Sequence, residues 1–272
     1  FCIILRYDVN EFTKSYGNSE KLLSLSGMDS IELFADSVQL KYSYENFLKN
    51  EKVTHLPVPV FKNKLTIKKK VKRVGPLNVG FLGVTRKEKG FEHLPKIIKL
   101  FNLQRKRTEQ EVNFVIQINK NYPSDLETTV KHLKGMEKKP EPVSRLILVN
   151  GPLNQFDYLT TLAGLDIMLM PYISKKYKNS TSGLLFEALE NNIPVVCGKK
   201  TWAGEIVIDA KKEGMLIGEC FSSINEIPCL IEKLILDLDR YKESIFEYLR
   251  KHPTHKFPNE IAKKLYEHTH AK

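Results

Sequence analysis

Long hydrophobic stretches are missing from this 272-residue sequence. No run approaches the roughly 18 consecutive apolar residues that a membrane-spanning helix needs. The opening FCIILRYDVNE becomes charged after five residues, which is too short for the apolar region of a signal peptide. With 42% hydrophobic and 28% charged residues, the composition is that of a globular protein rather than a disordered chain. We therefore expect a cytoplasmic protein with a packed core.

Cysteine is also scarce. The four cysteines form no CxxC pair, and no histidine lies at metal-ligand spacing from them, so neither a disulfide framework nor a zinc site is indicated. Buried free thiols are the interpretation that burial statistics favour. The seven histidines do not gather near one turn, and packing or surface roles are the default for each. We predict no metal and no cofactor.

Acidic residues are absent from residues 62–73, where KNKLTIKKKVKR holds seven basic residues among twelve. The net charge of +11 is therefore partly concentrated in one segment, which we interpret as a linker between domains. The run is consistent with a peripheral contact with an anionic membrane on its inner face. Because no aromatic residue lies within it, a protein that reads single-stranded nucleic acid by stacking is not indicated.

Beyond the basic run, short apolar runs alternate with longer amphipathic stretches, which indicates an α/β fold with a parallel sheet covered by helices on both faces. The spacing predicts strands over 77–83, 112–118, 145–151, 165–172, 193–198 and 214–221. Helices are expected to begin near Phe91, Asp125, Phe156, Gly183, Trp202 and Ile224. A doubly wound, Rossmann-like domain is the expected architecture.

Residues 1–60 offer too little for an independent domain. FCIILRYD is typical of a strand, residues 18–40 read as helical material broken near Gly27, and THLPVPV is an extended exit because Pro57 and Pro59 oppose helix. We predict four parts: a partial N-terminal α/β segment at 1–60, a basic linker at 61–75, the Rossmann-like domain at 76–252, and a C-terminal helix at 253–272.

Ligands of doubly wound sheets bind at the carboxyl ends of the strands, so each strand-to-helix turn is a candidate site. The first turn, GFLGVTRKEKG, carries Arg86, Lys87 and Lys89 beside a helix start, where backbone N–H groups and the helix dipole favour an anion. Phosphate binding is one interpretation, and a solvated basic turn is the other. The glycines lack the spacing of the dinucleotide fingerprint.

The second turn, PYISKKYKNSTSGLLFEALE, leads into a helix that begins near Gly183. Hydroxyl residues such as Ser182 can cap this helix, and its free N–H groups can face an anion. Glu187 lies one turn further along, where a carboxylate can bind a sugar diol; a buried Glu with a structural role is the alternative. The third turn, GKKTWAGE, adds Lys199 and Lys200, while core packing is the favoured role of Trp202.

Four segments resemble, in the same order, elements of the GT-B-fold glycosyltransferases, in particular the C-terminal domain of the family 4-like, group 1 enzymes. GVTRKEKGFEHLPKII resembles their phosphate loop, and GPLNQFDYLTTLAGLDIMLMPY is similar to the helix and strand that end in Pro-Tyr. NSTSGLLFEALENNIPVV looks like the nucleotide-binding helix, and TWAGE resembles the turn after the Pro-Val-Val strand. The matches cover residues 77–205.

This resemblance implies a metal-independent transfer of a sugar from a nucleoside-diphosphate sugar to a glycan or glycolipid acceptor, as in polysaccharide biosynthesis. It makes Glu187 the ligand of the ribose hydroxyls, and Arg86 and Lys89 the cations that neutralise the diphosphate leaving group. The implied donor-binding residues are Gly83, Thr85, Ser182, Gly183, Leu184 and Glu187. Nothing in it identifies the nucleotide, the sugar or the acceptor.

The sequence departs from the family pattern at two positions. Asn179 stands where retaining members often carry a second Glu, and Val84 stands where a basic residue usually follows the loop glycine, so Arg86 must substitute for it. Neither retention nor inversion is therefore implied. Residues 1–60 match only the later half of a first domain, so about half of that domain is expected to be missing, by truncation or by shortening.

A second class of function stays open. The basic face of a Rossmann scaffold without catalytic activity can bind nucleic acid or an anionic membrane. Polyanion binding loses affinity steeply as salt rises, whereas binding of one diphosphate in a cleft depends on salt less. We favour the enzyme, because the cations at the turns lie where a doubly wound sheet binds ligands.

Overall fold

The computed structural model describes residues 2–5, 9, 31–49, 52–56, 75–104, 110–138, 144–173 and 175–252. The chain divides into two compact units, which we describe separately. Unit 1 comprises Phe1–Lys62, Lys175–Gly183 and Pro253–Lys272, and unit 2 comprises Asn63–Ser174 and Leu184–His252. The basic run at 62–73, the predicted helix at 253–272, and Arg6, Tyr7 and Asp8 lie outside the described residues.

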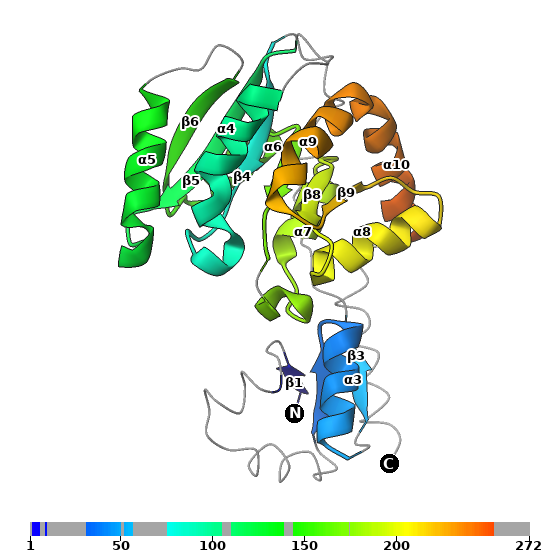
Figure 1. The fold of residues 1–272 in the computed structure, drawn as a ribbon. Coiled ribbons are helices and arrows are strands. Elements are labelled where there is room, and N and C mark those ends of the chain that lie inside the picture. Colours follow the sequence, from blue (N-terminus) through cyan, green and yellow to red (C-terminus); the bar gives the residue numbers. More distant parts are fainter. Residues whose placement is uncertain are drawn as a thin grey trace. The chain divides into compact units, whose positions relative to one another are not determined.

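Unit 2 is built on a parallel sheet of six strands in the order β6-β5-β4-β7-β8-β9 (Figure 1). The strands are β4 (Leu77–Phe81), β5 (Val112–Asn119), β6 (Ser144–Gly151), β7 (Ile167–Met170), β8 (Val195–Gly198) and β9 (Gly218–Phe221). This is the doubly wound order, and each strand falls within or beside a range predicted from the sequence. The α/β, Rossmann-like fold class is therefore confirmed.

Helices follow each strand of this sheet. They are α4 (Leu94–Gln104), α5 (Glu127–Glu137), α6 (Gln155–Ala163), α7 (Gly183–Glu190), α8 (Trp202–Lys212), α9 (Ile227–Leu236) and α10 (Leu238–Lys251). Helix α4 contacts both α5 and α9, and the three lie together over the sheet in Figure 1. Short 3₁₀ turns precede α4, α5 and α9, at Phe91–His93, Ser124–Leu126 and Ile224–Glu226. None of the helices in the described part of the chain is long and apolar enough to cross a membrane.

Burial in the core of unit 2 explains why its strands appear in the sequence as continuous apolar runs and not as alternating patterns. Every residue of β7 and β8 is buried, because helices cover both faces of the sheet. Aromatic side chains fill the space between β5 and α4, where the rings of Phe101 and Phe114 meet edge to face at 5.2 Å. Such a core fixes the strand ends that carry the turns.

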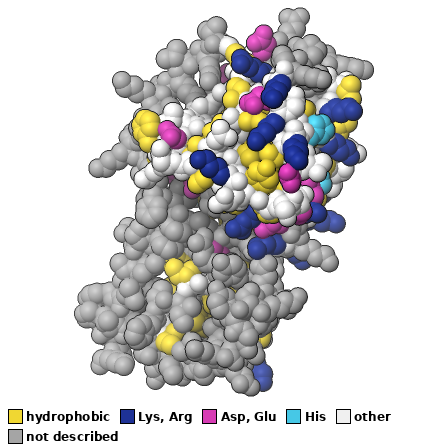
Figure 2. Space-filling model, turned by 90° about the vertical axis from the view of Figure 1, so that its left-hand side faces the viewer, with side chains coloured by type: hydrophobic (Ala, Val, Ile, Leu, Met, Phe, Trp, Pro, Cys, Tyr) yellow, Lys and Arg dark blue, Asp and Glu magenta, His cyan; other side chains and the backbone are white. Residues whose placement is uncertain are grey.

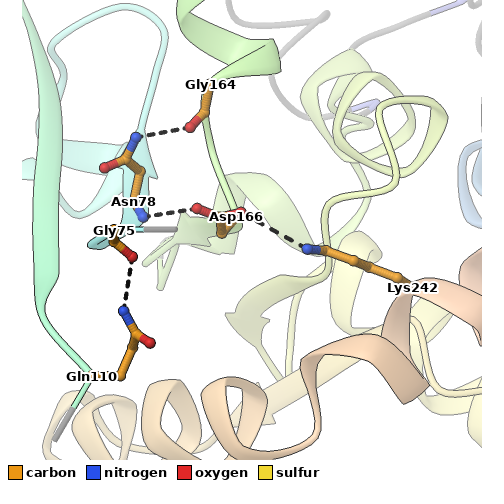
Figure 3. Close-up of polar contacts among 6 residues, drawn as sticks. All are labelled: Gly75, Asn78, Gln110, Gly164, Asp166 and Lys242. Carbon is orange, nitrogen blue, oxygen red and sulfur yellow. Dashed lines mark hydrogen bonds and ion pairs between the residues drawn. The ribbon is translucent and has the colours of Figure 1, made fainter. Parts of the chain in front are cut away.

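A cluster of polar residues lies at the amino-terminal ends of the strands, opposite the ends that carry the strand-to-helix turns (Figure 3). The carboxylate of Asp166 is 1% exposed and accepts a 3.0 Å hydrogen bond from the backbone N–H of Asn78. Lys242 of α10 lies 3.8 Å from its other oxygen. The Asn78 side chain donates to the Gly164 carbonyl at 2.8 Å. Asp166 lies in the segment GPLNQFDYLTTLAGLDIMLMPY, directly before β7, and its contacts assign it a structural role.

Replacing Asp166 with Ala is expected to destabilise unit 2 by about 2 kcal/mol, because a half-buried N–H loses its acceptor and Lys242 loses its counter-ion. Urea denaturation followed by circular dichroism measures the loss. Asp209→Ala is the matched control: its carboxylate pairs with Lys212 at 2.8 Å on the surface, where such a pair contributes at most about 1 kcal/mol. Equal losses in the two variants would contradict the structural role.

Unit 1 contains a second, smaller parallel sheet in the order β1-β2-β3. Its elements are β1 (Cys2–Leu5), β2 (Glu32–Ala35), α3 (Val38–Phe47) and β3 (Val53–His55). Ser37 caps α3, because its hydroxyl accepts from the N–H of Leu40 at 3.1 Å. The helical interpretation of residues 18–40 is wrong for 32–35, which form the central strand of this sheet.

Residues Lys175–Gly183, which connect β7 to α7, belong to unit 1, whereas β7 and the rest of α7 belong to unit 2. It contains a 3₁₀ turn at Lys175–Lys178. The hydroxyl of Thr181 donates to the carboxylate of Asp36 at 2.6 Å, and that of Ser37 donates to the Asn179 carbonyl at 3.1 Å. Asn179, at the position of the second family Glu, is therefore held through its backbone. The predicted continuous domain at 76–252 stays a prediction.

The cysteines follow the sequence interpretation only in part. Cys197 is buried, as expected, and its sulfur lies 3.9 Å from that of half-buried Cys220 on the neighbouring strand. Cys229, however, is exposed, so burial is the wrong interpretation for this thiol. Its position in α9 faces solvent, whereas Ile227 and Ile231 of the same helix face the core.

Candidate functional site

The β4–α4 turn and the end of β7 meet where the strand order of unit 2 reverses, the place where doubly wound sheets bind ligands. Gly90, in the left-handed conformation with φ +72°, shows how closely they approach. A Cβ atom added to it would lie 2.0 Å from the carbonyl oxygen of Pro171, directly after β7. The β4–α4 turn, which the sequence predicted to bind phosphate, therefore packs directly against the end of β7.

The side chain of Gln117 and the backbone N–H of Asn119, both on β5, hold this turn in place. The N–H of Gly83 donates to the side-chain oxygen of Gln117 at 3.0 Å. The hydroxyl of Thr85, which is fully buried, accepts from the N–H of Asn119 at 2.9 Å. Both residues were predicted to bind the donor; these two groups bond within the protein, and the donor-binding role of the residues stays a prediction. Sequence reasoning missed Gln117 and Asn119, although they are the polar residues at the end of the otherwise apolar strand VNFVIQIN.

Lys89 is the half-buried cation of the site. Its ammonium group lies 5.7 Å from the centre of the Tyr172 ring, and a Cβ on Gly83 would come within 3.0 Å of it. Burial lowers the pKa of Lys89, and the nearby charge of Arg86 lowers it further, while Glu88 and Glu187 act in the opposite direction. Lys89 thus lies beside Tyr172, directly after β7, the strand that leads into α7 and Glu187.

Arg86 differs from Lys89 in exposure. Its side chain is 51% exposed, and its guanidinium lies 3.8 Å from the carboxylate of Glu88, which is itself on the surface. Such a pair holds the side chain only weakly, so Arg86 can turn toward an incoming anion. Lys87 likewise lies on the surface, 3.5 Å from Glu92. Of the predicted cations in this turn, Lys89 is the one whose position the fold fixes.

Glu187 lies in the second turn of α7 with a partly exposed side chain. One of its carboxylate oxygens accepts a hydrogen bond from the hydroxyl of Tyr158 on α6. The Tyr158 pKa is raised, because burial and the charge of Glu187 disfavour the phenolate, so the phenol is protonated and donates. Sequence reasoning missed Tyr158, although it lies inside the quoted segment GPLNQFDYLTTLAG.

The start of α7 contains the other predicted donor-binding residues. Ser182 and Gly183 are half-buried and fall in unit 1, while Leu184 is buried and falls in unit 2. The first N–H groups of a helix have no acceptor inside the helix, so they remain available to an anion. The roles predicted for these residues stay predictions.

The third predicted turn follows β8. Lys199 and Lys200 are exposed, and Thr201 caps α8 through a 3.1 Å hydrogen bond from the N–H of Gly204. Trp202 is buried against Phe186 of α7, with ring centres 5.8 Å apart, so the packing interpretation is confirmed. This contact supports α7 from the side of α8.

Among the residues that the structure describes, no group of three His, Cys, Asp or Glu side chains could hold a metal ion. The polar groups near the strand-order reversal are instead a lysine, a carboxylate and phenols. Such a set suits a ligand that carries negative charge at one end and hydroxyl groups at the other.

No protein-family model and no curated protein sequence matches this chain. Solved structures do. The chain is similar to OtsA in its apo form, with a TM-score of 0.70, 10% sequence identity, and coverage of 97% of this chain and 67% of that one. It is similar to a UDP-forming trehalose-phosphate synthase from Burkholderia xenovorans, with a TM-score of 0.67, 11% identity, and coverage of 99% and 68%.

A third similar structure is HepE of Anabaena in complex with UDP, with a TM-score of 0.67, 13% identity, and coverage of 98% of this chain and 72% of that one. The matched structures are GT-B glycosyltransferases, and at these identities the likeness establishes that the chain has the GT-B fold. The chain spans between a half and about two thirds of the first three matched structures.

Proposed function

We propose that this chain is a glycosyltransferase, or the donor-binding part of one, that moves a sugar from a nucleoside-diphosphate sugar to a glycan or lipid-linked acceptor. The observation that supports the proposal is the packing of the β4–α4 turn, with Lys89, against the end of β7, the strand that leads to Glu187 in α7, at the strand-order reversal of a GT-B fold. A similar structure holds UDP, which has a diphosphate for the cation and a ribose for the carboxylate.

In this proposal the residues act by charge and position. Breaking the bond between the anomeric carbon and the diphosphate leaves negative charge on the leaving phosphate. Lys89, packed against the turn, and the exposed guanidinium of Arg86 stabilise that charge as it develops, without a metal ion. The N–H of Leu184 and the dipole of α7 add to this field. Glu187 accepts hydrogen bonds from the ribose hydroxyls and so orients the nucleotide.

The charge distribution supports this reading over a polyanion-binding scaffold. On the face of unit 2 shown in Figure 2, Lys and Arg side chains are interspersed with acidic and hydrophobic ones. A surface that grips nucleic acid or an anionic membrane gathers charge of one sign. A steep loss of UDP affinity between 50 and 200 mM salt, on the order of 10³-fold or more, would favour the scaffold instead.

A nucleoside diphosphate is expected to raise the melting temperature of the wild-type chain, and Glu187→Ala is expected to remove most of the rise. Ligand at 100 times its Kd stabilises a protein by about 2.7 kcal/mol. Losing a charged acceptor weakens binding by roughly 10- to 100-fold. A thermal-shift panel of UDP, GDP, ADP and CDP measures both effects.

Glu243→Ala provides the control for this panel, because Glu243 is an exposed carboxylate of α10. Its shift should equal that of the wild type. A wild-type chain that none of the four nucleotides stabilises would overturn the proposed function. A Glu187→Ala variant with an unchanged shift would remove Glu187 from the site.

A further inference from the structure

The hydroxyl of Tyr158 is the partner that holds the Glu187 carboxylate. The two residues come from different crossovers: Tyr158 lies on α6, between β6 and β7, and Glu187 lies on α7, between β7 and β8. The phenol donates a hydrogen bond to Oε2 of Glu187. A Glu side chain has several rotatable bonds, and fixing it before a ligand arrives reduces the entropy lost on binding.

Other polar groups near Glu187 do not perform this task. Asn191 donates to the main-chain carbonyl of Glu187 at 2.8 Å, which closes the end of α7 and leaves the carboxylate alone. On α6, Asn154 and Asp157 bond to each other at 2.8 Å, and the hydroxyl of Thr161 donates to the Asp157 carbonyl at 2.7 Å. Among the described residues, Tyr158 is thus the one hydrogen-bond donor to the carboxylate.

The bond also determines which oxygen of Glu187 faces a ligand. Tyr158 is half-buried and stays protonated, since burial and the Glu187 charge raise its pKa. A protonated phenol has one proton to donate, and it is given to Oε2. The second oxygen, Oε1, has no hydrogen-bond partner in the described part of the chain and can accept from a hydroxyl group.

We propose that Tyr158 is a positioning residue that sets the preference of this site for ribose, by fixing Oε2 of Glu187 so that Oε1 accepts from the ribose diol. The inference rests on the proposed function, because it names how the same site recognises its nucleotide. Tyr158 itself need not touch the ligand. Its removal should therefore weaken recognition of the diol and leave recognition of the diphosphate intact.

Tyr158→Phe keeps the ring and removes the hydroxyl group. Isothermal titration with UDP and with 2′,3′-dideoxy-UDP separates the two parts of recognition, and the matching pair for GDP, ADP or CDP is used if one of those binds instead. The wild type should prefer the ribonucleotide. In Tyr158→Phe, affinity for the ribonucleotide should fall roughly three- to tenfold, while affinity for the dideoxy form stays the same. The ratio of the affinity for the ribonucleotide to that for the dideoxy form should therefore fall by the same roughly three- to tenfold factor.

Two further variants distinguish a positioning role of Tyr158 from a general loss of local structure. Tyr248→Phe changes a buried tyrosine of α10 whose ring stacks on His252, and it should leave the preference unchanged. In a Glu187→Ala background, Tyr158→Phe should have no further effect on the preference, because the two act as one unit. A further loss in that background would overturn the inference.

The outcomes also separate this inference from the proposed function. If the wild type binds UDP and Tyr158→Phe keeps the full ribose preference, the role of Tyr158 is overturned and the proposed function stands. If the wild type binds none of the four nucleotides, both are overturned together. If Tyr158→Phe weakens UDP and dideoxy-UDP equally, Tyr158 has only a structural role and the inference is wrong.

Discussion

Lys89→Ala is expected to reduce the rate of donor cleavage by about 10²- to 10³-fold, the effect of removing one preorganised group that stabilises a developing anion. The fold places this ammonium group beside Gly83 of the β4–α4 turn and 5.7 Å from the centre of the Tyr172 ring. It therefore needs little reorganisation when the diphosphate leaves. Because the burial that lowers its pKa also strengthens its field, the loss should exceed that from any exposed lysine.

The measurement does not require the acceptor. Slow hydrolysis of the sugar nucleotide releases the same diphosphate as transfer to a glycan does, and coupled detection of the released nucleotide follows it. Lys96→Ala, an exposed position on α4, is the matched control and should retain the wild-type rate. A Lys89→Ala chain that hydrolyses the donor at the wild-type rate would exclude Lys89 from the reaction.

The same lysine predicts a pH dependence. The ammonium form binds the diphosphate, and the pKa of Lys89 is below that of an ordinary lysine, mainly through burial. Affinity should therefore be constant at neutral pH and fall as pH rises through this lowered pKa, before ordinary lysines lose their protons. In Lys89→Ala this step should be absent from a titration of affinity against pH. If the step persists in the variant, another group causes it.

The sequence was sufficient to predict the six-stranded sheet because its central strands are buried on both faces, which makes β7 and β8 continuous apolar runs. It failed at β2. ELFA lies in a segment rich in helix-compatible residues, and its strand state depends on pairing with β1 and β3, which are distant in sequence. Tertiary pairing of this kind overrides local propensity.

The sequence could propose only part of the candidate site. Lys89 and Glu187 were selected because strand-to-helix turns can be read from apolar periodicity, and the turn defines the face on which a residue lies; their roles stay predictions. Tyr158 could not be found in this way. It lies within a helix, and which helix it faces depends on how α6 and α7 pack. Nor does the pattern reveal that Gly83 and Thr85 bond to Gln117 and Asn119, because these contacts join segments 34 residues apart.

Gly90→Ala is expected to destabilise unit 2 by about 2–5 kcal/mol, a large effect for a single methyl group. Two physical causes add. The left-handed conformation at φ +72° costs an L-residue roughly 1–2 kcal/mol. The new Cβ would also lie 2.0 Å from the carbonyl oxygen of Pro171, and because this is backbone, the turn or the end of β7 must shift, at about 1–3 kcal/mol more.

Gly214→Ala isolates the first cause from the second. Gly214 has φ +80°, and a Cβ there meets nothing within 4 Å, so its substitution should cost only the conformational part. Urea denaturation of both variants gives the difference in stability, and equal losses would show that the Pro171 contact does not contribute.

Since Lys89 precedes Gly90 directly, the shift that relieves the clash also displaces the ammonium group. Gly90→Ala should therefore lose nucleotide binding even under conditions in which it remains folded, whereas Gly214→Ala should retain it.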